Sequence, residues 1–462
     1  MLRNFKKKFI GDKAFYRRYL LIAIPMIIQN FITNFVSFLD NIMVGQLGTE
    51  QMTGVAIINQ LYFVYSLAIF GVASAASIFG AQYYGKRDFK GHMYTFRFRI
   101  YMIACVTIIA ALIFIFGGET LISLYLTAES GEGNAALTLA YAKEYLSVVM
   151  IGFVPFALTQ AYASIVKETG QTFIPMVAGL SGVIINAVLD YMFIFGLGPI
   201  PSMGVTGAAF ATVIARFIEC AVVVIWAHTH TQENQFLIGA YKGFGLPMDL
   251  YKKIMKKGTP LILNEILWAC GMTALTQAYS IRGLEIVASI NIANTINNLF
   301  NIVFIQLGAC ISIIVGQYLG AGELEEAKDA DNKMIFFSVA CCTVMSLLMI
   351  AIGKFFPLLY NTSDHIREIA TKFIYVQAIM MPFFSFSHCS YFTLRSGGKT
   401  GVTFIFDSGF TWVIMVPVAL CLSMFSPLSI VMVYYLTNAT EYIKNAMGFF
   451  MVKSNVWLNK LV

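Results

Sequence analysis

Two stretches of this 462-residue chain match each other without a gap: GTEQMTGVAIINQLYFVYSLAIFGVASAASIFGAQYYG (residues 48–85) and GLEIVASINIANTINNLFNIVFIQLGACISIIVGQYLG (residues 283–320). The offset between the two copies is 235 residues. Nine positions carry the same residue type in both, and in the first copy they are Gly48, Glu50, Ile57, Asn59, Ser77, Ile78, Gln82, Tyr83 and Gly85. One ancestral unit was therefore duplicated, and we expect two similar halves.

The composition is that of a membrane protein. Hydrophobic residues make up 58% of the chain and charged residues only 12%, with a mean hydropathy of +0.74. A soluble domain carries about 25% charged residues. Because a membrane helix needs about 20 mostly apolar residues, the length suffices for about a dozen spans with short loops. The eight cysteines show neither disulfide nor metal-ligand spacing.

Apolar runs between charged or Gly/Pro breaks predict twelve spans, six in each half. They cover residues 18–44, 52–81, 95–117, 139–163, 172–196, 205–227, 258–281, 286–314, 334–357, 368–392, 401–425 and 428–451. The predicted fold class is an all-α membrane protein of two parallel-repeat six-helix bundles, because an even number of spans gives both halves the same orientation. We expect an N-terminal bundle at 1–230, a cytoplasmic linker at 231–257 and a C-terminal bundle at 258–462.

The distribution of Lys and Arg predicts that both termini are cytoplasmic. With the N-terminus inside, 24 of the 31 Lys and Arg residues fall on the inner side, five on the outer side and two within spans. Loops rich in Lys and Arg stay in the cytoplasm. The net charge of +7 is therefore assigned to these loops, and we expect no nucleic-acid partner.

Carboxylates within the predicted spans are the main functional candidates, because an unpaired charge in hydrocarbon is costly. At about 1.5 Å per residue, Asp40 lies late in the first span and Asp190 late in the fifth. Asn186 shares a helix face with Asp190, and Thr206 opens the sixth span. These four residues are expected at one depth in the outer part of the first half. Asp40 could alternatively cap a broken helix, and Thr206 could cap its own helix.

A site with two carboxylates is suited to binding a small cation. Two neighbouring carboxylates in a low-dielectric site cannot both ionise cheaply. Asp40 and Asp190 could hold a proton, or they could hold Na⁺ together with the Asn186 carbonyl oxygen and a hydroxyl. The sequence leaves both ions open, and we expect no organic cofactor.

The second half carries different acids. Glu265 and Asp407 are each expected in the inner part of their spans, and they are secondary acidic candidates. Asp40 corresponds to Leu275 under the 235-residue offset, so the outer acidic cluster belongs to the first half alone. A duplicated scaffold with this chemical asymmetry indicates that the two halves have specialised.

Other polar or helix-breaking residues within spans have simpler interpretations. Arg216 with Glu219, and Glu441 with Lys444, are spaced i, i+3 and are predicted to form internal ion pairs. Pro25 could bend the first span as a hinge, or it could be a first-turn proline. No Gly-rich phosphate loop and no nucleophile–base or metal-ligand arrangement is legible, so we expect neither ATP as the energy source nor an enzyme.

Four motifs resemble the multidrug and toxic compound extrusion (MATE) family. The first runs from Pro25 to Gly48 and contains PMIIQN and LDNIMVGQLG. The others are KETGQTFIP at 167–175, NAVLDY…GLGPIPSMGVTGAA at 186–209 and LRSGGKT at 394–400. The length, the twelve spans and the two halves also match along the whole chain.

The resemblance implies a secondary antiporter with two bundles and alternating access to the two sides. It implies export of organic cations and amphiphilic drugs in exchange for H⁺ or Na⁺. Asp40, Asn186 and Asp190 match the family's ion-coupling positions, Thr206 matches loosely, and Glu265 falls near a seventh-helix acid used by some members. The family's bending of the first helix maps onto Pro25. The tenth span lacks the acid found in some Na⁺-coupled members.

The resemblance also sets the expected location and partners. We expect a monomer in the bacterial cytoplasmic membrane, with small cationic or amphiphilic substrates and membrane lipid as its partners. A flippase of lipid-linked saccharides from the same superfamily is an alternative, but its phosphate-bearing substrates would favour a cationic cavity. An ion channel or an intramembrane enzyme is a more distant alternative.

Overall fold

The structure, a computed structural model, describes residues 8–128, 134–243 and 245–462. Three of the basic residues counted above (Arg3, Lys6 and Lys7) and Phe244 of the predicted linker lie outside these ranges.

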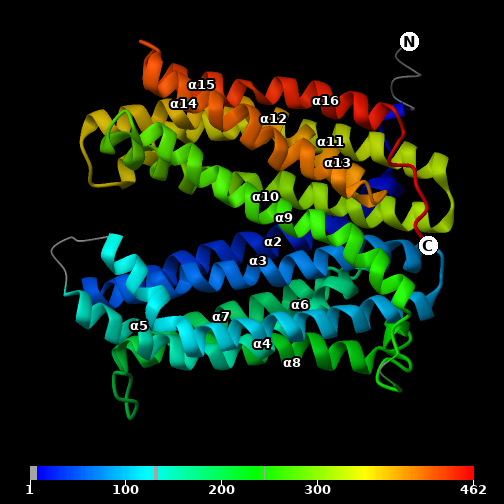
Figure 1. Cartoon of the computed structure of the whole chain (residues 1–462), viewed down its shortest axis with the longest axis horizontal. Helices are drawn as coiled ribbons and strands as arrows, with labels where there is room; N and C mark the ends of the chain where they lie inside the picture. The colour runs from blue at the N-terminus through cyan, green and yellow to red at the C-terminus, as the bar shows by residue number, and fades with distance from the viewer. Residues whose placement is uncertain (1–7, 129–133, 244) are drawn as a thin grey trace. The chain divides into compact units, whose positions relative to one another are not determined.

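Figure 1 shows the chain as a succession of helices. Their bounds are α2 Lys13–Gly45, α3 Thr49–Gly85, α4 Phe89–Ala128, α5 Ala135–Val149, η1 Met150–Gly152, α6 Phe153–Glu168, α7 Phe173–Phe195, α8 Gly204–Thr229, η2 Gln235–Leu237, α9 Met248–Ser280, α10 Leu284–Ala321, α11 Leu324–Gly353, η3 Phe356–Leu359, α12 Asp364–Ser396, α13 Thr400–Phe404, η4 Ile405–Gly409, η5 Thr411–Met415, α14 Val416–Phe425, α15 Ile430–Ala439 and α16 Glu441–Lys453.

The predicted fold class is confirmed, because each of the twelve predicted spans falls on helical residues. Nine helices in the described ranges are long and apolar enough to cross a membrane. The remaining predicted spans fall on α2, on α9 and on α15 with α16. The last two helices have 10 and 13 residues, so neither alone has the length of a span.

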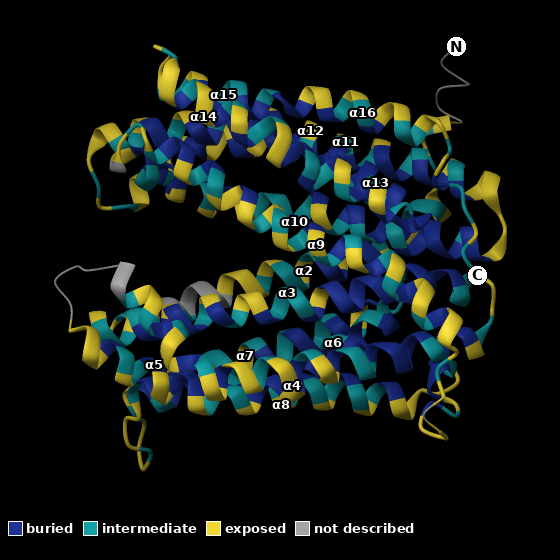
Figure 2. Cartoon of the chain, in the orientation of Figure 1, coloured by how far each residue is buried: buried dark blue, intermediate teal, exposed yellow. Residues whose placement is uncertain are grey.

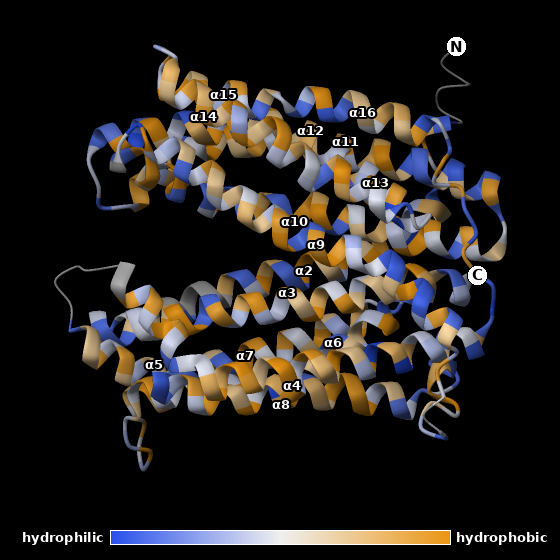
Figure 3. Cartoon of the chain, in the orientation of Figure 1, coloured by the Kyte–Doolittle hydropathy of each residue, from blue (hydrophilic) through white to orange (hydrophobic). Residues whose placement is uncertain are grey.

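The lipid-facing surface of the helices explains their composition. On α4, the exposed side chains include Ile115, which is 61% exposed, and Phe116, which is 83% exposed. Figure 3 shows hydrophobic residues along much of this helix, and Figure 2 shows that many residues on it are exposed. A surface of this kind is typical of helices that face the hydrocarbon of a bilayer.

The chain divides into two compact units. Unit 1 contains residues 1–27, 81–88 and 252–462, and unit 2 contains residues 28–80 and 89–251. In unit 1, Tyr19, Ile22 and Met26 of α2 belong to a buried core with residues of α10, α11 and α12. In unit 2, a core of α4, α6, α7 and α8 residues closes over the buried Phe236 of η2.

The sequence repeat marks a close helix crossing within unit 1. A Cβ atom at Gly85 would overlap the Gln317 carbonyl oxygen, and one at Gly320 would overlap the Gln82 carbonyl oxygen. Gly85 corresponds to Gly320, and Gln82 to Gln317, under the 235-residue offset. The ends of α3 and α10 therefore pack against each other through equivalent residues. Both copies of the repeat carry glycine at this position because neither site has space for a side chain.

Several helix boundaries differ from those predicted. The helix α9 begins at Met248, about ten residues before the expected start of its span. The extra turns carry Asp249 and several lysines, so they form helix without contributing to an apolar run. Three predicted spans are irregular: η1 interrupts the fourth, the π-helical turns η4 and η5 lie in the eleventh, and Thr440 separates α15 from α16 in the twelfth.

Candidate cation site

The helix α7 carries a polar face that is built from residues four apart. Gly182, Asn186 and Asp190 follow one another at this spacing and therefore share one side of the helix. A Cβ atom at Gly182 would lie 3.3 Å from the Ala215 carbonyl oxygen of α8. The glycine lets α8 approach closely, while the two polar residues continue along the same face.

A second contact fixes α7 against α2. A Cβ atom at Gly179 would lie 2.9 Å from Nε2 of Gln29 on α2. Asp190 is eleven residues after Gly179, and Asp40 is eleven residues after Gln29. Eleven residues are about three helical turns, so both acids return to the faces that are already in contact.

The structure accordingly brings Asp40 and Asp190 close together, and their carboxyl groups lie within electrostatic range of each other. Asp190 is fully buried, and Asp40 is partly buried. Within residues 8–128, 134–243 and 245–462, Oδ1 of Asp40, both carboxyl oxygens of Asp190 and Nδ2 of Asn186 are buried without a hydrogen-bond partner. A buried unsatisfied polar group costs about 1–3 kcal/mol. The arrangement is therefore suited to binding a proton or a small cation between two carboxylates.

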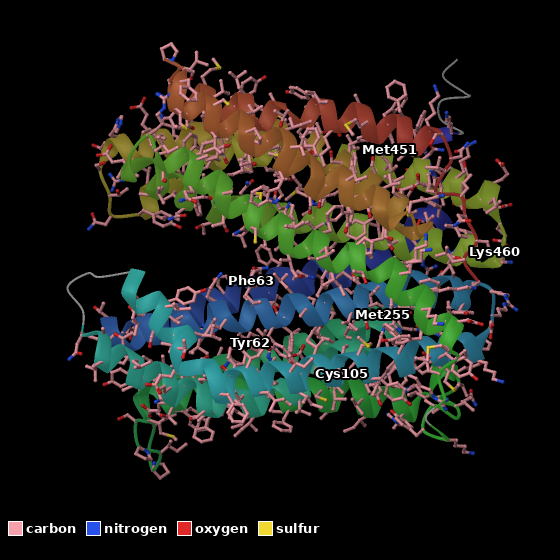
Figure 4. All side chains as sticks on the ribbon, viewed as in Figure 1. Tyr62, Phe63, Cys105, Met255, Met451 and Lys460 are labelled. Atoms are coloured by element: carbon pink, nitrogen blue, oxygen red, sulfur yellow. The ribbon has the colours of Figure 1, made fainter. Side chains whose placement is uncertain are left out.

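Two tyrosines that the sequence did not single out lie in this part of unit 2. Tyr145 on α5 is 2% exposed and interacts electrostatically with both acids. Tyr62 on α3, labelled in Figure 4, lies near Arg216 of α8. The predicted pair of Arg216 and Glu219 is confirmed at 2.9 Å, so the guanidinium already has a carboxylate partner. Tyr145 lies near the start of the fourth predicted span, so its distance along the span indicates the same outer depth as Asp40.

Thr206 makes a contact that was not predicted. Its hydroxyl donates a hydrogen bond to Oε1 of Glu144 on α5. Glu144 precedes Tyr145, so α5 contributes both residues from adjacent positions. The assignment of Thr206 to cation coupling stays a prediction.

The second-half candidates belong to another polar cluster, in unit 1. Asp407 on η4 forms an ion pair with Lys444 on α16 at 2.9 Å and accepts a hydrogen bond from Asn264 on α9 at 3.0 Å. Glu265 follows Asn264 and interacts electrostatically with Asp407. Asp407 therefore already has two strong partners, unlike Asp40 and Asp190.

The described residues contain no group of three or more His, Cys, Asp or Glu side chains placed to hold a metal ion. The predicted Na⁺ site at Asp40, Asn186 and Asp190 has two carboxylates and one amide, and it stays a prediction.

Pro25 lies inside α2, twelve residues after the helix begins at Lys13, so the first-turn alternative is wrong. A proline at this position removes one backbone hydrogen bond of the helix. The division between unit 1 and unit 2 crosses α2 between Ile27 and Ile28, directly after this proline.

Comparisons with known proteins give the family. The MatE family model matches residues 25–192 and 260–421, and its two matches begin 235 residues apart. A probable multidrug resistance protein NorM from Thermotoga maritima is 23% identical over 408 residues, which cover 87% of this chain and 84% of the relative. Crystal structures of a MATE protein in the straight and bent conformations give TM-scores of 0.82 and 0.80. Each covers 96% of this chain, at 19% and 18% identity, and 96% and 97% of the respective other chain.

The two model matches together span well over half of the chain, and the fold agrees over nearly its whole length. The resemblance drawn from the motifs is therefore confirmed. This integral membrane protein belongs to the MATE family of transporters.

Proposed function

We propose that the protein is a secondary antiporter that exports organic cations and amphiphilic drugs in exchange for H⁺ or Na⁺. The site for the coupling ion is formed by Asp40 and Asp190, with Asn186 beside them. Thr206 is the fourth residue that we assign to this site. The protein acts in the bacterial cytoplasmic membrane as a monomer with both termini inside.

The observation that carries this proposal is that Asp40 and Asp190 lie close together, while Oδ1 of Asp40 and both carboxyl oxygens of Asp190 are buried without a hydrogen-bond partner among the described residues. Two ionised carboxylates repel each other and have no proton to share, so the pair is stable only when it holds a cation. A proton and Na⁺ both meet this need. Membership of a transporter family and the name of the Thermotoga relative support multidrug export as the process that the ion drives.

Pro25 supplies the proposed hinge. A helix that lacks one backbone hydrogen bond bends more easily at that point. Uptake of a cation neutralises the charge between Asp40 and Asp190 and so stabilises one arrangement of α2 against α7. Release of the cation restores the repulsion and favours the other arrangement, in which the transport site opens to the opposite side.

The test is uptake of a fluorescent organic cation into proteoliposomes under separately imposed pH and Na⁺ gradients. The ion whose gradient drives uptake is the coupling ion. Asp190→Asn and Asp40→Asn are each expected to lower gradient-driven uptake at least tenfold, because a neutral amide does not exchange a cation. Glu119→Gln is the matched control, since its carboxylate is exposed and pairs with Lys143 at the surface.

Full gradient-driven uptake by both aspartate variants, with the same ion dependence as the unmodified protein, would refute the coupling role. Equal loss of uptake in Glu119→Gln would show that the measurement responds to any lost carboxylate.

A further inference from the structure

Lys444 lies in the centre of the polar cluster of unit 1. Its ammonium nitrogen is 2.9 Å from Oδ1 of Asp407 and 3.9 Å from Oε1 of Glu441. It also lies 5.3 Å from the centre of the Phe406 ring. The Lys444 side chain is only 8% exposed, so two carboxylates and one aromatic face surround a nearly dehydrated cation.

The carboxylate that holds this cation is itself fixed in place. Oδ2 of Asp407 accepts a hydrogen bond from Nδ2 of Asn264 at 3.0 Å. Oδ1 of Asn264 in turn accepts hydrogen bonds from Oγ of Ser408 at 2.7 Å and from the Ser408 backbone N–H at 3.2 Å. Asn264 and Ser408 are each 1% exposed. These contacts join α9 to the π-helical turn η4, and such turns frequently mark functional sites.

Several acidic side chains lie around Lys444, so the stability of the cluster depends on the positive charge of its ammonium group. Asp407 and Glu441 are both acidic, and Glu265 of α9 lies within electrostatic range of Asp407 and of Arg395. Removing one partner of a buried ion pair leaves an uncompensated charge, which is strongly destabilising. Without Lys444, a mobile cation would be the simplest replacement.

The two units thus differ in whether a side chain of the protein supplies a positive charge to the paired carboxylates. Among the described residues, no Lys or Arg side chain forms an ion pair with Asp40 or Asp190, and Arg216 pairs with Glu219. The pair in unit 1 has a cation attached to the chain. We infer that Lys444 occupies a monovalent-cation site formed by Asp407 and Glu441, so that this half binds no exchangeable ion unless the lysine is removed. The inference rests on the proposed function in one respect, namely that ion exchange is assigned to Asp40 and Asp190.

The experiment uses purified full-length protein in detergent, in which Asp40→Asn and Asp190→Asn together silence the unit 2 pair. Thermal unfolding is measured in choline chloride, sodium chloride and methylammonium chloride. Before Lys444 is changed, the melting temperature is expected to be the same in all three salts. With Lys444→Ala added, it falls by several degrees in choline, which is too large for the site. Sodium or methylammonium restores most of the loss in a saturable manner.

A matched variant separates a cation site from a structural ion pair. Adding Asp407→Asn and Glu441→Gln to Lys444→Ala removes all three charges of the site, so the melting temperature in choline is expected to recover and the response to small cations to disappear. An equal loss in all three salts with Lys444→Ala would overturn the inference. So would a Lys444→Ala protein that fails to fold in every salt while the variant that also carries Asp407→Asn and Glu441→Gln folds. Folding of Lys444→Ala only in sodium or methylammonium would support it.

This readout needs no transport, so it separates the two proposals. Recovery by small cations together with absent antiport would refute the proposed function alone. Antiport through Asp40 and Asp190, together with a Lys444→Ala protein that ignores small cations, would refute the cation-site assignment alone.

Discussion

Buried charge in unit 2 is also found away from the candidate cation site, where three side chains of α4 and α6 meet. Arg99 is fully buried and donates to Oε1 of Glu168. Nε2 of His92 lies 3.3 Å from Oε2 of the same carboxylate. A Cβ atom at Gly80 of α3 would overlap that carboxylate, so the glycine makes room for the group. This cluster ties three helices together through one glutamate.

Glu168→Gln is expected to destabilise the protein by about 3–5 kcal/mol, because it leaves the buried Arg99 without its carboxylate. The measurement is the thermal unfolding midpoint in detergent. Glu119→Gln breaks an ion pair with Lys143 whose two side chains are 62% and 52% exposed, and it is expected to cost at most about 1 kcal/mol. Equal shifts for the two variants would contradict the assigned role of Glu168.

The depth of Asp40 and Asp190 was predictable from the sequence, whereas the direction in which a side chain points around its helix was not. Counting residues along the spans predicted Asp40 and Asp190 at one level, and the structure brings the two carboxyl groups together. Lys444 was paired with Glu441 from their i, i+3 spacing, which exists at 3.9 Å. The closer partner, Asp407, lies on another helix. The spacing of residues along one helix does not indicate a contact between two different helices.

Among the helices, α3 and α10 make the closest use of the sequence repeat. Their ends pack through Gly85 and Gly320, and each glycine faces a carbonyl oxygen of a glutamine on the other helix. The two glutamines also hold other segments. Gln82 accepts the backbone N–H of Leu461, and Gln317 accepts a hydrogen bond from Arg18. The contact therefore fixes both helix ends together with the segments around Arg18 and Leu461.

Gly85→Ala and Gly320→Ala are each expected to lower the yield of folded protein severely, because the added methyl group meets backbone rather than a movable side chain. The measurement is the monodisperse fraction in size-exclusion chromatography and the thermal midpoint. Gly117→Ala on α4 is the control, since an added Cβ there has no heavy atom within 4 Å. It is expected to stabilise slightly, by up to about 1 kcal/mol. Normal folding of both Gly85→Ala and Gly320→Ala would show that the ends of α3 and α10 can separate without loss of stability.

Helix existence was predictable because a membrane span is long and uniformly apolar, so the signal accumulates over some twenty residues. The interruptions were not predictable for the same reason. The η1 turn, the π-helical turns η4 and η5, and the break at Thr440 each involve a few residues within an apolar run. Averaging over a window conceals them. One of these irregular stretches, η4, carries Asp407.

For the whole molecule, the distribution of Lys and Arg predicts which side each loop faces. Ser202, between α7 and α8, is exposed and is expected outside the cell. Ser454, after α16, is exposed and is expected in the cytoplasm. The prediction depends on charge alone and is independent of the coupling mechanism.

In a cysteine-free background, Ser202→Cys is expected to react with a membrane-impermeant maleimide in intact cells. Ser454→Cys is expected to react only after the membrane is permeabilised. The reverse pattern would invert the topology and would place the basic loops outside.

The division of the chain into two units does not fall mainly in loops. It crosses α2 between Ile27 and Ile28 and α9 between Tyr251 and Lys252, and it crosses α3 between Gly80 and Ala81. Any rearrangement of one unit against the other must therefore be absorbed by flexing of continuous helices, whose backbone hydrogen bonds resist bending. Transport rate should consequently respond to helix stiffness at these three positions, even for substitutions that touch neither ion nor drug. Pro25 lies beside the first of them.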